Sequence, residues 1–190
     1  MASHVALLRG INVGGRNKVP MAELREVVTS LGYTAVTTYI QSGNVLFTTP
    51  DTDTAQMASA LESAVSGAFG ITASVVVLSR DQLVRVLADN PYTEEPNPRF
   101  VHVVFLSAEL PKDLFDRIKA AESAAAAKGN RDTVTAIGQA LFVHTPDGYG
   151  TSELAEGLFR IIGTPGHTGV TATARNWATS TKLLSLCEAK

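Results

Sequence analysis

Short apolar runs alternate along this chain with stretches in which apolar residues recur every three or four positions. The spacing therefore predicts strands alternating with amphipathic helices. In the first half it predicts four strands, over residues 5–11, 33–41, 45–49 and 73–78. Two helices are expected between them, with apolar faces running from Met21 to Leu31 and from Met57 to Phe69. Ser42-Gly43-Asn44 is a typical turn sequence. The resulting order, βαββαβ, is the ferredoxin-like arrangement.

The second half repeats most of this order as βαββα. The expected elements are a strand, a helix, a hairpin turning at Gly138-Gln139 and a further helix, over residues 100–106, 112–128, 132–144 and 152–162. A last helix is expected from about Ala174 to Cys187, with Thr173 as its N-cap. We expect that helix to pack back on the body of the protein through Trp177, Leu183 and Leu184.

A proline-rich segment separates the two halves. Three prolines occur in the eight residues 91–98, after a short helix expected from Arg80 to Asn90, and this composition predicts an irregular connector. The sequence thus predicts an α+β protein with two subdomains related to the ferredoxin-like fold. Residues 1–80 form the first, residues 81–98 the helix and connector, and residues 99–190 the second with its C-terminal helix.

Charge and cysteine content narrow the range of partners. The net charge is −2 and the sequence pI is about 6.1, so no overall positive field is present to hold nucleic acid. The first expected strand has no aromatic residue and the third has only Phe47, which also argues against an RNA-recognition sheet. Cys187 is the only cysteine, which excludes an internal disulfide. No apolar stretch approaches the ~18 residues that cross a bilayer, and no leader pattern is present. We expect a cytoplasmic protein with no membrane partner.

The strand-to-helix connection over residues 9–18 is the first candidate site. It combines glycines with cationic and amide side chains, and such loops present backbone N–H groups and charge to anions. The candidate ligand-binding residues there are Arg9, Asn12, Gly14, Gly15, Arg16 and Lys18. The alternative is a tight turn that needs glycines for positive φ. The spacing matches neither a P-loop nor a dinucleotide fingerprint, and Glu23 and Glu26 lie close by.

Two further polar groups complete the candidate set. Arg175 and Asn176 follow Thr173, and a cation in a first helical turn opposes the helix dipole unless an anion lies beside it. Ser42 and Asn44 belong to the expected hairpin turn. We hypothesise that Arg175 lies near the glycine loop and that one anion binds both. The alternative is an internal salt bridge from Arg175 to a carboxylate such as Glu23 or Glu156.

No recognisable catalytic set accompanies these residues. The chain has no nucleophile elbow and no Ser-His-Asp order, and its four histidines lack the spacing of a metal site. The sequence therefore assigns no catalytic residue, metal or cofactor. The leading hypothesis is a binding module for a small anion bearing phosphate or carboxylate. One alternative is an enzyme, a phosphotransferase or hydrolase, using the same residues. Another is a structural protein that dimerises through a sheet edge or face, so either a monomer or a homodimer is compatible.

Several blocks of the sequence together resemble the bacterial DUF1697 family. They are residues 8–15, 21–24, 40–45, 90–92, 102–106 and 173–177. The resemblance covers nearly the whole chain. It implies two α+β subdomains of ferredoxin-like character, in agreement with the spacing of apolar residues. Because the family is one of unknown function, the resemblance implies no activity.

Overall fold

The computed structural model describes residues 1–163 and 168–189. The chain divides into two units, residues 1–85 with 182–190 and residues 86–181. The division falls within two helices, α3 (Arg80–Ala88) and α7 (Trp177–Glu188). In the described part of the chain, no helix has the length and apolar character needed to span a bilayer.

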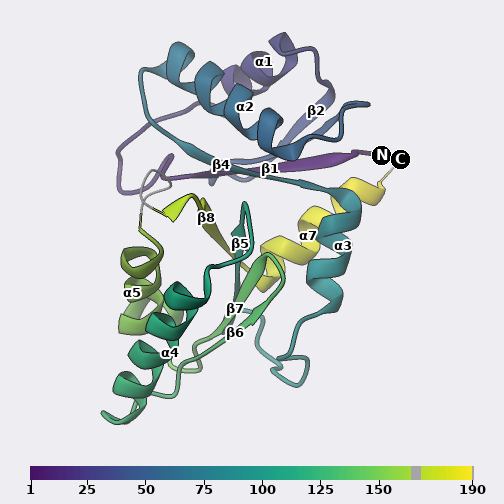
Figure 1. The fold of residues 1–190 in the computed structure, drawn as a ribbon. Helices are drawn as coiled ribbons and strands as arrows, with labels where there is room; N and C mark the ends of the chain where they lie inside the picture. Colours follow the sequence, from purple (N-terminus) through teal and green to yellow (C-terminus); the bar gives the residue numbers. More distant parts are fainter. Residues whose placement is uncertain (164–167, 190) are drawn as a thin grey trace. The chain divides into compact units, whose positions relative to one another are not determined.

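The first unit is a four-stranded antiparallel sheet with two helices on one face (Figure 1). Its elements run β1 (His4–Arg9), α1 (Met21–Ser30), β2 (Thr34–Tyr39), β3 (Asn44–Thr48), α2 (Thr54–Phe69) and β4 (Ser74–Ser79). The strand order is β2-β3-β1-β4, which is the ferredoxin-like order expected for residues 1–80. The helices pack on Leu8 and Phe47 of the sheet through Leu24 and Val28 of α1 and Leu61 of α2. The apolar helix faces predicted from the sequence therefore face the core.

The second unit has the same topology as the first. Its elements are β5 (Val101–Leu106), α4 (Lys112–Ala126), β6 (Thr133–Ile137), β7 (Ala140–His144), α5 (Glu153–Ile162) and β8 (Ala172–Asn176), with a 3₁₀ turn at Tyr149–Thr151. The order β6-β7-β5-β8 matches that of the first sheet strand for strand. The α+β class with two related subdomains is therefore confirmed, and the second repeat is complete as βαββαβ.

The eighth strand corrects the predicted start of the last helix. Residues 172–176 pair with β5, with Val103 opposite Arg175, and the helix begins only at Trp177. Ala and Asn are poor strand formers, but the open edge of β5 supplies hydrogen-bond partners for this segment. Tertiary pairing therefore overrides local propensity at this position.

The buried side of α7 also differs from the prediction. Trp177 and Leu184 are only half-buried, whereas Leu183 and Cys187 are fully buried. Leu183 was expected at the contact, and Cys187 follows it by one helical turn. Beginning the helix three residues later places Asn176 at its N-cap, where its Oδ1 accepts a hydrogen bond from the Thr179 N–H at 2.7 Å. Thr173, the predicted cap, lies within a strand instead.

The proline-rich segment folds onto the second sheet. The Tyr92 hydroxyl lies 3.0 and 3.1 Å from the hydroxyls of Thr133 and Thr135 on β6. Glu95 lies 2.7 Å from the Nε2 atom of His144 on β7, and its carboxylate also accepts a hydrogen bond from the Asn97 N–H. Both contacts lower the pKa of Glu95, the Asn97 N–H more strongly. The segment is irregular, as expected, but side chains hold it in place.

Candidate functional site

The glycine-rich connection between β1 and α1 forms a small hairpin. Val13 and Arg16 face each other in an antiparallel bridge, and the Arg16 N–H donates to the Val13 carbonyl at 3.1 Å. Gly14 and Gly15 turn the chain between them with φ of 57° and 76°. Positive φ at both central positions is the requirement of a type I′ turn, so the two glycines have a conformational role.

Two asparagines fasten this hairpin to the rest of the unit. The Asn12 side chain accepts a hydrogen bond from the Val19 N–H at 2.8 Å and donates to the Val19 carbonyl at 2.9 Å. The same amide group donates to the Gln41 carbonyl at 2.9 Å. Asn17 donates to the Gly10 carbonyl at 2.8 Å. Both asparagines have positive φ, a conformation that Asn tolerates better than most residues.

The hairpin directs cationic side chains to solvent. Arg16 and Lys18 are exposed, and among the described residues neither makes an ion pair or a side-chain hydrogen bond. Some backbone N–H groups of the loop are already occupied, because Asn12 donates to Asn17 and Val19 to Asn12. Gly14 and Gly15 remain exposed at the tip. Arg9 lies half-buried at the end of β1, away from that tip along the chain.

The Ser42-Gly43-Asn44 turn is built into the core of the same unit. Buried Asn44 donates to the Tyr39 carbonyl at 3.0 Å and to the Ser42 hydroxyl at 2.9 Å. Gly43 accepts a hydrogen bond from the Leu8 N–H at 2.8 Å. A Cβ at Gly43 would lie 2.8 Å from Cβ of Leu8 and 2.9 Å from Cδ1 of Ile11. The turn therefore approaches β1 too closely for any residue but glycine.

Ile40, between these two groups, has an unusual backbone conformation. Its φ is 49°, which is rare for a β-branched residue, and its side chain is 50% exposed. The carbonyls on either side are held by different asparagines, Tyr39 by Asn44 and Gln41 by Asn12. These side-chain contacts explain how the conformation is maintained.

Arg175 occupies a buried strand position, so the helix-dipole argument for an anion beside it is wrong. Its guanidinium donates to the Thr173 hydroxyl at 2.9 Å and to the Ala174 carbonyl at 2.8 Å. Burial lowers its pKa to about 10, so the side chain is charged at neutral pH. Asn176 caps α7, and its predicted role in ligand binding stays a prediction. Arg175 belongs to the second unit and the glycine hairpin to the first, so their sharing of an anion stays a prediction.

The second unit contains a buried polar pair that the sequence did not reveal. The Ser152 hydroxyl donates to Asp132 at 2.6 Å and accepts a hydrogen bond from the Ala155 N–H at 2.9 Å. Ser152 is thus the N-cap of α5, and Asp132 fixes the orientation of its hydroxyl. In the sequence, the only indication of this pair is Ser152 at the start of an amphipathic stretch, a position typical of an N-cap residue. Because the Ser152 hydroxyl both donates and accepts a hydrogen bond here, we assign it a structural role.

Nearby, His102 stacks on Tyr149 with ring centroids 3.7 Å apart. Burial lowers the pKa of His102 to about 4, so the ring is neutral at physiological pH. Its Nδ1 atom is buried and makes no hydrogen bond within the described residues. Across residues 1–163 and 168–189, no group of three or more His, Cys, Asp or Glu side chains is placed to hold a metal ion.

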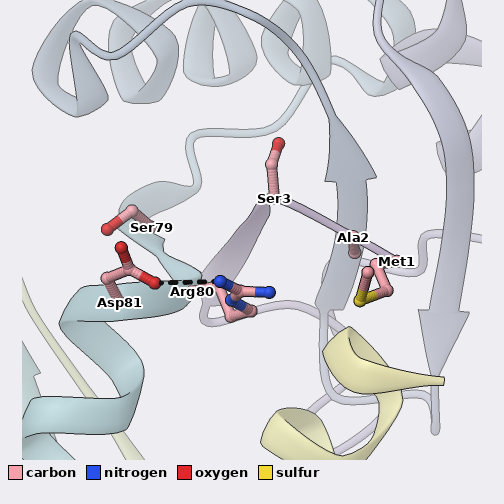
Figure 2. A pocket seen from close by; sticks show the side chains of 6 residues that line it. All are labelled: Met1, Ala2, Ser3, Ser79, Arg80 and Asp81. Carbon is pink, nitrogen blue, oxygen red and sulfur yellow. Dashed lines mark hydrogen bonds and ion pairs between the residues drawn. The ribbon is translucent and has the colours of Figure 1, made fainter.

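A surface cavity of about 280 Å³ lies beside the start of α3 in the first unit (Figure 2). It is lined by Met1, Ala2, Ser3, Ser79, Arg80 and Asp81. Ser79 and Gln82 form a reciprocal capping box, with hydrogen bonds of 3.1 and 2.8 Å. Arg80 pairs with Asp81 at 3.3 Å, as Figure 2 shows. The polar groups here are largely paired with one another, so the cavity has no evident ligand chemistry.

Comparison with known proteins identifies the family of this chain and a solved structure similar to it. Residues 1–142 match the family described as "Protein of unknown function (DUF1697)". The chain belongs to this family. A solved structure, the conserved bacterial protein SP0830 from Streptococcus pneumoniae, is similar with 26% sequence identity and a TM-score of 0.70. The similarity covers 98% of this chain and 99% of that one. No curated protein gives a significant match.

Proposed function

We propose that this DUF1697 protein is a cytoplasmic binding module for a small anion bearing phosphate or carboxylate. The ligand binds at the glycine hairpin of the first unit, between the cations Arg16 and Lys18. The observation that carries this proposal is a pair of exposed cations on a hairpin fastened by Asn12 and Asn17. A hairpin held this way loses little conformational entropy on binding.

The chemistry of the hairpin tip suits an anion with several oxygen atoms. Arg16 offers a planar fork of donors that matches phosphate or carboxylate. Lys18 adds a mobile charge two residues along the chain. The exposed N–H groups of Gly14 and Gly15 supply weaker, directional donors. The ligand remains partly in solvent, so we expect modest affinity that falls as salt concentration rises.

The test is calorimetric titration with inorganic phosphate, pyrophosphate, nucleotides and dicarboxylates at low salt. The double variant Arg16→Ala/Lys18→Ala should lose binding. Its control is Arg117→Ala/Lys182→Ala, which removes the same charges from exposed helix positions. Binding by neither the wild type nor the control would refute the proposal. Equal loss in both double variants would show a general effect of net charge and would refute it as well.

A further inference from the structure

The edges of the two sheets are not equally protected. An edge strand presents unpaired N–H and C=O groups, which natural proteins usually cover or charge. On β4, the Val75 N–H donates to the Glu62 carboxylate of α2 at 2.8 Å. On β6, the Val134 N–H donates to Glu122 of α4 at 3.1 Å, and the Val134 carbonyl accepts from Lys119 at 3.3 Å. Charged helix residues thus engage backbone groups on the edges of both strands.

β2 occupies in the first sheet the position that β6 occupies in the second, but it lacks this protection. In the described part of the chain, no side chain bonds the N–H groups of residues 36–39. At the adjoining turn, the Asn44 side chain donates to the Tyr39 carbonyl. From α1, Arg25 reaches the Thr38 hydroxyl at 2.9 Å and leaves the backbone uncovered. The shared strand order of the two sheets makes this difference plain.

The sequence of the edge also lacks the usual protective residues. Residues 32–43 contain no charged residue and no proline. β-branched and aromatic residues, which favour strand pairing, fill positions 36–40. A register irregularity between Thr34 and Thr37, with Ala35 at φ 50°, interrupts only the beginning of the strand. A bulge of this kind bends the beginning of the strand and leaves its remainder, up to Tyr39, available.

This segment is complementary to itself when two copies run antiparallel about Thr38. Thr38 then faces Thr38 of the second copy, and Thr37 faces Tyr39. Threonine–threonine and aromatic–β-branched pairs are cross-strand combinations that stabilise sheets. With no charge in residues 32–43, no like charges meet within the paired strands. Ile40 takes no part, because its φ of 49° turns the chain away from the strand.

We propose that the free edge of β2 pairs antiparallel with β2 of a second copy of the chain, centred on Thr38. The two four-stranded sheets of the first units then form one continuous sheet with an isologous interface. Because the paired segment is short, the association is weak and depends on protein concentration. The partner is a second copy, and not an unrelated peptide, because Thr37, Thr38 and Tyr39 face matching residues when the segment pairs with itself.

Sedimentation velocity on the full chain tests this proposal over roughly 5 µM to 1 mM, the range in which a small interface associates. The wild type should shift from monomer to dimer across that range. Thr37→Lys, an exposed substitution that places charge on the edge, should weaken dimerisation at least about tenfold. Thr34→Lys makes the same change at an exposed position before the irregularity and should dimerise like the wild type.

Two outcomes would contradict the proposal. A wild type that stays monomeric would refute self-pairing and would mean that the edge of β2 binds a different partner or none. Dimerisation of Thr37→Lys equal to that of the wild type would refute the assigned surface.

Disulfide cross-linking supplies the register. Residues directly opposite in an antiparallel pair have Cα atoms about 4.5–5.5 Å apart, within reach of a disulfide. Thr38→Cys should therefore form a covalent dimer on mild oxidation, and Thr34→Cys should not. The native Cys187 is buried and its pKa is raised to about 11, so it does not compete. Cross-linking of both variants at equal rates would contradict pairing about Thr38.

Discussion

Asn12 and Val19 are joined by two hydrogen bonds between a side-chain amide and a backbone peptide group. The Asn12 Oδ1 atom accepts from the Val19 N–H at 2.8 Å, and its Nδ2 atom donates to the Val19 carbonyl at 2.9 Å. The same Nδ2 atom also donates to Gln41, 29 residues further along the chain. One side chain therefore closes the glycine hairpin and attaches it to the turn before β3.

Asn12→Asp tests this connection. Aspartate tolerates positive φ and retains an acceptor, but it cannot donate to Val19 and Gln41, and its charge faces both carbonyls. We expect the free energy of unfolding to fall by about 2 kcal/mol or more, measured by urea denaturation. Asn17→Asp makes the same change where one exposed hydrogen bond is lost, and about 1 kcal/mol or less is expected. Equal losses in the two variants would contradict the central role of Asn12.

Gly43→Ala should be among the most damaging small substitutions in the chain. The new methyl group would meet Leu8 and Ile11 at 2.8 and 2.9 Å, and φ is 77°. We expect a loss of about 2–4 kcal/mol from combined overpacking and backbone strain. Gly15→Ala has a similar φ with open space around the Cβ and should cost only about 1–2 kcal/mol. If thermal and urea unfolding show the same loss of stability for Gly43→Ala and Gly15→Ala, the close approach of Gly43 to β1 does not contribute to stability.

Ala35→Gly should stabilise the protein. Ala35 is exposed and has φ of 50°, so removing its Cβ relieves strain at little cost in packing. A gain of about 0.5–1 kcal/mol in the free energy of unfolding is expected. The same change at Ala120, an exposed interior position of α4, should destabilise by about 1 kcal/mol. Opposite signs in chemical denaturation would confirm the left-handed conformation at Ala35. A loss at both positions would contradict it.

His102 should make stability depend on pH. Its pKa is lowered to about 4 in the folded protein from 6.5, so between these values the unfolded chain binds more protons. The free energy of unfolding is then highest above pH 6.5 and falls as pH drops towards 4, by at most about 3 kcal/mol.

His102→Phe keeps an aromatic ring against Tyr149 and removes the titrating group. Urea denaturation at several pH values should show a flatter profile for this variant between pH 4 and 6.5. Part of the slope should persist, because burial also lowers the pKa of His4. An unchanged slope in His102→Phe would show that the His102 ring of the wild type is protonated equally in the folded and unfolded states.

The sequence by itself determined the local elements and most of their order. Leu24 and Val28 on α1, and Met57, Leu61 and Val65 on α2, recur at helical spacing and are all buried. The hairpin at Gly138-Gln139 was also correct, with Ile137 opposite Ala140. These features depend on residues a few positions apart, so spacing and turn chemistry suffice to predict them. The glycine-rich polar connection of residues 9–18 was recognisable for the same reason, although its hairpin form was not.

Only the tertiary structure decided what depends on distant partners. Residues 172–176 became strand β8 because β5 offers an edge for pairing, which moved Arg175 from a helix start to a buried strand position. Asn12 reaches Gln41, and Gly43 presses on Leu8 and Ile11, through contacts that no local pattern encodes. The protected edge of β6 and the open edge of β2 likewise differ through side chains on helices separated from them in sequence. Each outcome depends on which chain segments lie side by side, and that follows from packing the whole unit.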